Sequence, residues 1–266
     1  MKIFVTVKQV PDTSGKVAVN PDGTLDRASM QTITNPDDLN AVEAALKLKD
    51  ETGCKVIIVT MGPPPAEGML REILARGADE AVLVSGREFG GSDTYATSQI
   101  LAAAINRIGV EKEDIIMCGR QAIDGDTAQV GPQIAEKLHL PQVTYAADIK
   151  KEGDTILVKR MLEDGYMTVK VQTPCLLTCI KELNEPRYMS VGGVFEAYSK
   201  PMSVFDYEAL KDDPLIDPTT IGLKGSPTNI LTSFTPPQKG AGMMLEGADK
   251  ETCEKLAGIL AKKHII

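Results

Sequence analysis

The sequence contains no tryptophan, aromatic residues make up 4% of its 266 positions, and His139 and His264 are its only histidines. So few aromatic rings argue against a platform on which nucleic-acid bases stack. Two histidines leave almost no material for a classical zinc site or a Ser-His-Asp triad. We therefore expect neither a nucleic-acid-binding protein nor a self-sufficient hydrolase.

Long apolar runs and a positive net charge are also missing. The longest apolar stretches, such as residues 55–61 and 175–180, are far shorter than the roughly 20 residues that span a bilayer. The N-terminal MKIFVTVKQV enters an apolar strand pattern at once and lacks a small-residue cleavage site, so we expect no signal peptide and no membrane insertion. A net charge of −8 supplies no basic surface for phosphate backbones, which again argues against nucleic acid as a partner.

The five cysteines are an odd number and include no C-x-x-C pair, so we expect reduced thiols and a cytoplasmic protein. Cys175 and Cys179 lie four positions apart in a strand-like run, which places both on one face of that strand. We expect these two thiols to pack in the core.

Short β-branched runs alternate with helical periodicity through the first two thirds of the chain, a pattern typical of βαβ units. It predicts strands over residues 3–7, 55–60, 80–84 and 114–118, and helices over about 36–52, 66–75, 97–108 and 130–138. Over residues 143–180 apolar residues recur with a period of two, which indicates strands. Two of these strands, 155–161 and 166–172, are predicted to pair as a β-hairpin. We expect an α/β fold with a mainly parallel sheet, helices on both faces and an antiparallel hairpin at one edge.

Periodicity weakens beyond Leu183, where proline, glycine and serine are frequent, until a last helix over about 249–263. So long a stretch with little periodicity indicates a functional segment or an extended arm. We therefore divide the chain into an α/β domain, residues 1–183, and a C-terminal arm with its helix, residues 184–266.

The strongest local signal follows the strand predicted at 114–118. Gly119 is succeeded by a polar, glycine-rich loop that runs into a helix at residues 126–131. Free backbone N–H groups and the helix dipole at such a start favour an anion, here a phosphate. The alternative is that Asp126 or Thr127 is only a helix N-cap. Asp124 and Asp126 are weak evidence for acid/base chemistry, because neither a sugar pocket nor metal ligands accompany them.

A second glycine-rich loop runs from Gly90 to Thr94, with Thr97 one turn later, again where a strand gives way to a helix. Ligands of open α/β sheets gather at the carboxyl ends of strands, so two such loops on one edge could hold one ligand with two phosphates. The alternative is an ordinary capped helix. Neither loop has the pattern G-x-G-x-x-G or G-x-x-x-x-G-K-[ST], so the usual dinucleotide and P-loop signatures are absent from both.

Five segments carry a resemblance to a known family: VKQVPDT at 7–13, NPDD at 35–38, MGPP at 61–64, GRQAIDGDTAQVGP at 119–132 and NEPRY at 184–188. In this order, and over nearly the whole chain, they resemble the beta subunit of electron-transfer flavoproteins. The resemblance implies a Rossmann-like adenine-nucleotide-binding fold and a heterodimer with an alpha subunit that carries FAD. It also implies that the C-terminal arm and its helix pack on that alpha subunit.

The family has two branches. In the ordinary branch the beta subunit holds AMP as a structural ligand, whereas in the electron-bifurcating branch the same site holds a second FAD that accepts hydride from NADH. FGGSDTYATS at 89–98 and GSPTNILTSFTP at 225–236 resemble the bifurcating branch. So does Gly125, because the AMP branch tends to carry a bulkier acidic residue there. The resemblance therefore favours FAD, with AMP as the alternative.

The resemblance also implies site residues. The adenosine side is expected at Val7, Lys8, Asn35, Asp38 and Met61. The phosphates are expected at Asp93, Thr94, Thr97, Gly119, Gln121, Asp124, Gly125, Asp126, Thr127, Ala128, Gln129, Val130 and Gly131. No side chain need act as an acid or base, because the flavin performs the chemistry.

Partners are implied in the same way. Electrons from NADH would pass to ferredoxin or flavodoxin and, through the alpha-subunit FAD, to an acyl-CoA-dehydrogenase-like or lactate-dehydrogenase-like flavoenzyme. The family segment that docks on this flavoenzyme matches NEPRYMSVGGVFEAYSKP, residues 184–201, without a clear match to its usual apolar anchor. A stand-alone nucleotide-binding stress protein of similar fold is a third interpretation, which leaves the C-terminal region unexplained.

Overall fold

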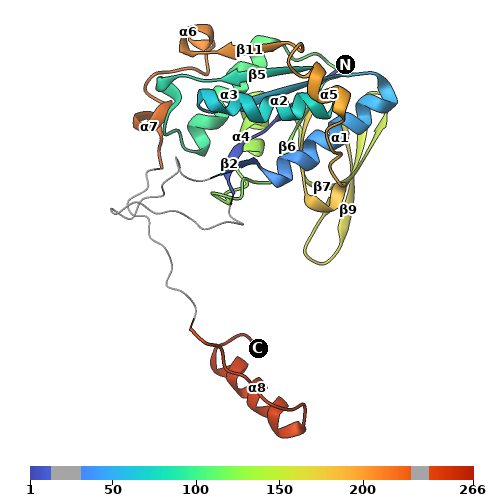
Figure 1. Ribbon diagram of the computed structural model, residues 1–266, viewed down its shortest axis with the longest axis vertical. Helices are drawn as coiled ribbons and strands as arrows, with labels where there is room; N and C mark the ends of the chain where they lie inside the picture. The colour runs from blue at the N-terminus through green and yellow to red at the C-terminus, as the bar shows by residue number, and fades with distance from the viewer. Residues whose placement is uncertain (13–30, 229–239) are drawn as a thin grey trace.

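The computed structural model describes residues 1–12, 31–228 and 240–266 (Figure 1). Its main sheet has nine strands in the order β11-β5-β4-β1-β6-β10-β7-β8-β9. These strands are β1 (Lys2–Thr6), β4 (Lys55–Met61), β5 (Glu80–Val84), β6 (Ile115–Gly119), β7 (Gln142–Glu152), β8 (Thr155–Met161), β9 (Tyr166–Gln172), β10 (Cys175–Cys179) and β11 (Met202–Phe205). A separate two-stranded sheet pairs β2 (Gln9–Pro11) with β3 (Thr32–Thr34).

Helices cover both faces of the main sheet. The α-helices are α1 (Pro36–Thr52), α2 (Glu67–Arg76), α3 (Thr94–Ile108), α4 (Val130–Lys137), α5 (Val191–Glu196), α6 (Tyr207–Leu210), α7 (Gly222–Gly225) and α8 (Lys250–Lys262). Short 3-10 turns are η1 (Pro64–Ala66), η2 (Arg87–Phe89) and η3 (Lys181–Leu183). Over the described ranges, no helix combines the length and the apolar character that a membrane crossing needs. The predicted α/β class with a mainly parallel sheet is confirmed.

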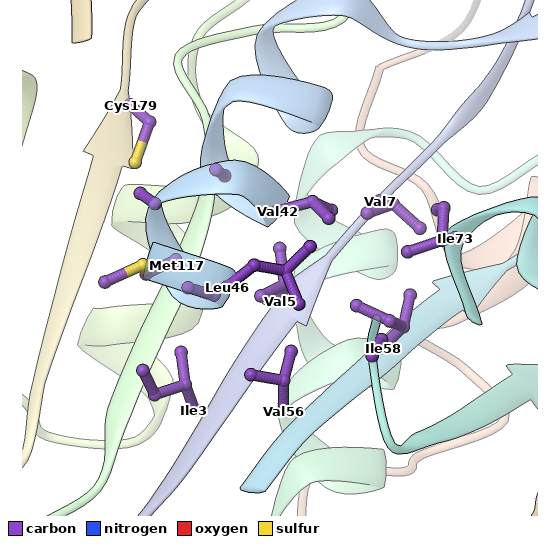
Figure 2. Close-up of a cluster of buried hydrophobic side chains, with 14 of the residues drawn as sticks. Ile3, Val5, Val7, Val42, Leu46, Val56, Ile58, Ile73, Met117 and Cys179 are labelled. Atoms are coloured by element: carbon purple, nitrogen blue, oxygen red, sulfur yellow. The ribbon is translucent and has the colours of Figure 1, made fainter. Parts of the chain in front are cut away.

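The parallel part of the sheet extends from β11 to β7. Strands buried on both faces carry continuous apolar runs, which is why they were visible in the sequence. Ile3 and Val5 of β1 belong to the hydrophobic cluster formed with α1 and α2, whereas Phe4 belongs to the cluster formed with α3 and α4. Figure 2 shows the first cluster around Leu46 of α1.

The antiparallel hairpin formed by β8 and β9 continues the sheet beyond β7, at the edge opposite β11. Its two strands have the residue bounds that the period of two predicted. The predicted antiparallel edge is therefore confirmed.

The order of the chain reverses between β1 and β6. From β1 the chain builds β4 and then β5 on one side of the sheet, and it crosses afterwards to β6 on the other side of β1. Open α/β sheets bind ligands at the carboxyl ends of their strands, at such a reversal. Val7 directly after β1, Met61 at the end of β4 and Gly119 at the end of β6 lie on this carboxyl edge.

Residues 184–228, the first part of the predicted arm, pack onto the α/β domain. β11 pairs in parallel with β5, and Met202 lies opposite Ala81. The buried apolar side chains of this region are Ala197, Leu210, Ile216 and Ile221. The sequence pattern missed β11, α6 and α7 because each spans only four residues, too few to establish a period.

The last helix, α8, corresponds to the one predicted over about 249–263. Asp249 caps it by accepting a hydrogen bond from the backbone N–H of Thr252 at 2.8 Å. None of its residues is buried, and the helix lies apart from the α/β domain (Figure 1). Residues 229–236, most of the GSPTNILTSFTP segment, lie outside the described residues.

Candidate functional site

The carboxylate of Asp38 joins the two strands between which the chain order reverses. Its Oδ2 accepts a hydrogen bond at 2.9 Å from the backbone N–H of Lys8, just beyond β1. Its Oδ1 accepts one at 2.8 Å from the backbone N–H of Gly119, at the end of β6. Burial raises the pKa of this carboxyl to about 7, although the two backbone donors lower it. Asp38 therefore sets the spacing between the ends of β1 and β6 and presents no free oxygen pair to a ligand.

Two glycines let helices approach the end of β6. A Cβ at Gly119 would lie 2.5 Å from Oδ1 of Asp38, and a Cβ at Gly131 would lie 2.6 Å from Sγ of Cys118. Both distances are well inside van der Waals contact, so glycine is required at each position. The first turns of α1 and α4 consequently lie directly against the carboxyl end of β6.

The loop over residues 120–129 is held by the N-cap residue of α1, Asn35. Its side chain makes no capping bond to its own helix. Instead, Nδ2 donates to the carbonyl oxygen of Gln121 at 2.8 Å, and Oδ1 accepts from the backbone N–H of Ile123 at 3.1 Å. The helix begins where the sequence predicts, but the side chain at its start fixes the loop.

Two residues of this loop, Asp126 and Ala128, have positive φ angles of 51° and 53°. Such angles are uncommon outside glycine and collect at ligand-binding sites. Within the described part of the chain, no acceptor is found for the backbone N–H groups of Thr127, Ala128 and Gln129. The loop therefore presents a run of backbone donors beside the first turn of α4, which is the arrangement that binds anions.

The second predicted loop meets the first one. Thr94, the first residue of α3, donates from Oγ1 to Oε1 of Gln129, the N-cap residue of α4, at 2.9 Å. Thr97 follows one turn along α3 and is half-buried. The structure thus brings the amino ends of α3 and α4 together at one edge, where the positive ends of two helix dipoles converge.

Asp93 is the N-cap of α3. Its Oδ1 accepts from the backbone N–H of Ala96 at 3.0 Å, and its Oδ2 accepts from the backbone N–H of Thr228 at 2.9 Å. Both oxygens are therefore used by the backbone of the protein itself, so the capped-helix alternative describes this residue.

Charged side chains also lie at the carboxyl edge of the sheet. Nζ of Lys8 lies 2.7 Å from Oδ1 of Asp124, which links the end of β1 to the 120–129 loop. Lys8 is half exposed, so this pair adds little stability. Nε of Arg120 lies 3.4 Å from Oδ2 of Asp37. Burial raises the pKa of Asp37, and Arg120 opposes that shift.

The remaining predicted residues lie at the same edge and differ in their burial and contacts. Val7 is buried, and Met61 and Val130 are half-buried. Gln121 donates from Nε2 to Oδ1 of Asp126 at 2.6 Å. Gly125 lies in open space, because a Cβ there would meet no atom of the described residues within 4 Å.

Sequence reasoning overlooked Arg120 and Asp37 as an ion pair, and Ser226 and Thr228 as neighbours of α3. The first two lie inside the GRQAIDGD and NPDD segments, and their charges could have indicated a pair. The other two lie in the weakly periodic region, which offered no signal.

Four of the five cysteines are buried, and Cys253 is exposed. Cys175 and Cys179 share the cluster that contains α1, as their spacing predicts. Burial raises the pKa of Cys175 to about 12 and shifts the pKa of Cys118 and Cys179 in the same direction. These thiols stay protonated near neutral pH and serve as packing groups.

The fold and this edge place the protein among doubly wound α/β proteins that bind ligands where strand order reverses. Residues 22–210 match the electron transfer flavoprotein domain. Over the full length of both chains, the sequence is 71% identical to the acryloyl-CoA reductase electron transfer subunit gamma of Anaerotignum propionicum and 54% identical to the caffeyl-CoA reductase-Etf complex subunit CarD of Acetobacterium woodii. It is 49% identical, again over all of both chains, to the electron transfer flavoprotein subunit beta of Clostridium acetobutylicum. The chain belongs to the electron transfer flavoprotein family, as a beta-type subunit.

Proposed function

We propose that this subunit holds FAD at the carboxyl edge of its sheet, in a complex where NADH delivers hydride and the two electrons separate. One electron goes to ferredoxin or flavodoxin, and the other passes through the FAD of an alpha subunit to a flavoenzyme of the acyl-CoA dehydrogenase or lactate dehydrogenase type. The names of two full-length relatives support a CoA thioester as the substrate of that flavoenzyme, since one is an acryloyl-CoA reductase electron transfer subunit and the other a subunit of a caffeyl-CoA reductase-Etf complex. The flavin, when bound, supplies the hydride and electron chemistry.

The observation that carries this proposal is the pairing of the two helix starts. A single phosphate needs one anion site, whereas the contact between Thr94 and Gln129 joins two. A ligand with two adjacent phosphates can use the loop over residues 120–129 and the start of α3 together. FAD has such a diphosphate, and AMP has one phosphate only.

Gly125 supports the same conclusion. Gly119 and Gly131 are required by contacts within the chain, but Gly125 has no neighbour that a Cβ would strike and no positive φ. The described residues give no reason for glycine at this position. Space for a bulky ligand beside the 120–129 loop supplies one.

The chain's own groups would bind and orient the flavin nucleotide. Backbone N–H groups of Thr127, Ala128 and Gln129 face the phosphates in this proposal, and the hydroxyl of Thr97 adds a neutral donor. The hydroxyl of Thr94 adds a second one by rotating from Oε1 of Gln129, to which it donates in the structure, toward the phosphate. Lys8 offers positive charge at the end of β1. The adenosine side would lie over Val7 and Met61, beside the turn that Asn35 and Asp38 hold.

Two surfaces fit the proposed partners. The segment 184–201 carries apolar side chains that the described parts of the chain leave exposed: Tyr188, Val191, Phe195 and Tyr198. We assign this surface to the flavoenzyme.

We assign α8 to the alpha subunit, because an amphipathic helix with no buried residue needs a partner to cover its apolar stripe. We place the complex in the cytoplasm because all five cysteines are free thiols, as expected in a reducing compartment.

Acid extraction of the purified heterodimer tests the cofactor. We expect two FAD molecules per heterodimer. One FAD together with one AMP would instead establish the non-bifurcating alternative, in which AMP is a structural ligand. Reduction by NADH, followed by measurement of electron arrival at ferredoxin, then separates electron splitting from simple transfer.

A further inference from the structure

A short segment that contains α7, the latch segment (residues 221–228), lies against the loop over residues 86–94. The backbone N–H of Leu223 donates to the carbonyl oxygen of Gly90 at 2.9 Å. A Cβ at Gly91 would lie 2.8 Å from Cβ of Leu223, so the two segments are in close backbone contact. The latch segment therefore packs on the loop that precedes α3.

Asp93 is the centre of this contact. Its backbone N–H donates to Oγ of Ser226 at 2.8 Å, and its Oδ2 accepts from the backbone N–H of Thr228 at 2.9 Å. Its other oxygen, Oδ1, caps α3 through the N–H of Ala96. One carboxylate thus binds both the start of a helix and a segment 135 positions away in the sequence.

An ordinary cap elsewhere in the chain shows what is unusual here. Asp206 caps α6 by accepting from the N–H of Ala209 at 2.9 Å, and the described residues supply no donor to its second oxygen. Capping a helix therefore requires one oxygen of the carboxylate. The second oxygen of Asp93 has a different use.

That use concerns the position of α3. Thr94 follows Asp93 directly and is the residue that contacts Gln129 at the start of α4. A shift of Asp93 would move the Thr94 hydroxyl, and Thr97 one turn further, relative to the 120–129 loop. The latch segment, through Asp93, thus defines the distance between the two proposed phosphate sites.

We propose that Asp93 is a positioning residue that fastens the start of α3 to the latch segment and so couples nucleotide binding to that segment. The inference rests on the proposed function, because it assigns one phosphate of FAD to the start of α3. Asp93 itself does not touch the nucleotide. Coupling is reciprocal: a ligand that fixes Thr94 and Thr97 also stabilises the latch segment, and loss of the latch contact weakens the ligand.

The test compares Asp93→Asn with Asp206→Asn in the full-length chain bound to its alpha subunit. Asparagine has the size of aspartate and keeps one oxygen for the cap, but its amide group cannot accept from a second N–H. We expect Asp93→Asn to weaken FAD binding by roughly three- to tenfold, the effect of one lost hydrogen bond. Asp206→Asn loses no such second bond and should leave the FAD dissociation constant unchanged.

Hydrogen exchange of the latch segment gives the readout that a purely local cap would not affect. FAD should slow exchange of the Thr228 amide in the wild-type complex, and Asp93→Asn should abolish that protection. The inference is overturned if FAD leaves this exchange unchanged in the wild-type complex, or if both variants bind FAD equally. If the wild-type complex binds AMP and no FAD at this site, the proposed function fails. The coupling then fails with it, because AMP has no second phosphate for the start of α3, whereas bound FAD with unchanged exchange at Thr228 overturns the coupling alone.

Discussion

Oδ1 of Asp38 accepts a hydrogen bond from the backbone N–H of Gly119 at 2.8 Å, in a space that leaves no room for a Cβ. The contact joins the first turn of α1 to the last residue of β6. A side chain at position 119 must displace the carboxylate or the strand. The geometry of the carboxyl edge therefore depends on the close contact between the Asp38 carboxylate and the backbone of Gly119.

Replacing Gly119 with alanine should lower the free energy of unfolding by roughly 1–3 kcal/mol, the usual cost of overpacking a core. Gly125→Ala is the matched control, since its Cβ would meet no atom within 4 Å. We expect its unfolding free energy to stay close to that of the wild type. Urea unfolding of both variants measures the difference, and equal stabilities would contradict the tight packing at Gly119.

The double substitution of Thr94 and Thr97 by alanine removes two neutral donors from the start of α3. Each is worth about 1 kcal/mol, so FAD binding should weaken by roughly 30-fold while AMP binding changes little. Ser98→Ala serves as the control because this hydroxyl is buried and donates to the carbonyl oxygen of Tyr95. Isothermal titration of the apo-heterodimer measures both ligands. An equal loss for FAD and AMP would place these threonines away from a second phosphate.

The pKa of Asp38 predicts a dependence of stability on pH. The folded chain holds this pKa near 7, above the ordinary value of 3.8, so between these values the folded state binds more protons than the unfolded state. Stability contributed by this group is complete below about pH 4, falls as pH rises and levels off above about pH 7, at a slope of at most about 1.4 kcal/mol per pH unit. Asp37 acts in the same direction.

Asp38→Asn should flatten this slope, although it lowers stability throughout, because its amide group faces a backbone donor. Urea unfolding from pH 4 to pH 8 measures the slope for both proteins. Identical slopes would show that Asp38 is ionised at all these values.

Deletion of residues 248–266 removes α8, none of whose residues is buried. The unfolding free energy should change by less than about 0.5 kcal/mol, as for other surface changes. Binding to the alpha subunit should be lost.

The longer deletion of residues 185–266 also removes β11 and the buried side chains of Leu210 and Ile216, and it should leave no stably folded domain. Size-exclusion chromatography with the alpha subunit and urea unfolding decide both points, and a stable 1:1 complex without α8 would refute its role as the contact.

Much of the fold could be predicted because its core strands are buried on both faces. β5 and the β8–β9 hairpin have the predicted bounds, since apolar runs and a strict period of two leave little freedom. β11 was not predicted, because its four residues are half-buried or exposed and so carry no continuous apolar run. Edge strands share this lack of an apolar pattern with loops.

The candidate site was predictable at the level of loops and less so at the level of side chains. Glycine-rich turns after strands indicated where α3 and α4 begin. The partners of Asp38, Asn35 and Asp93 were not visible, because each bonds to residues 80 or more positions distant. Only the folded arrangement reveals which polar groups the protein uses for itself.

The pairing of β11 with β5 bears on how the chain is made. β5 ends at Val84, and its outer edge receives a partner only when Met202 to Phe205 are available. At roughly 5–20 residues per second, a ribosome needs about 6–24 s to synthesise the intervening residues. During that interval the nascent chain carries an unpaired apolar strand edge, which is a template for aggregation. Synthesis of this subunit should therefore depend on chaperones that shield β5 until the last third of the chain emerges.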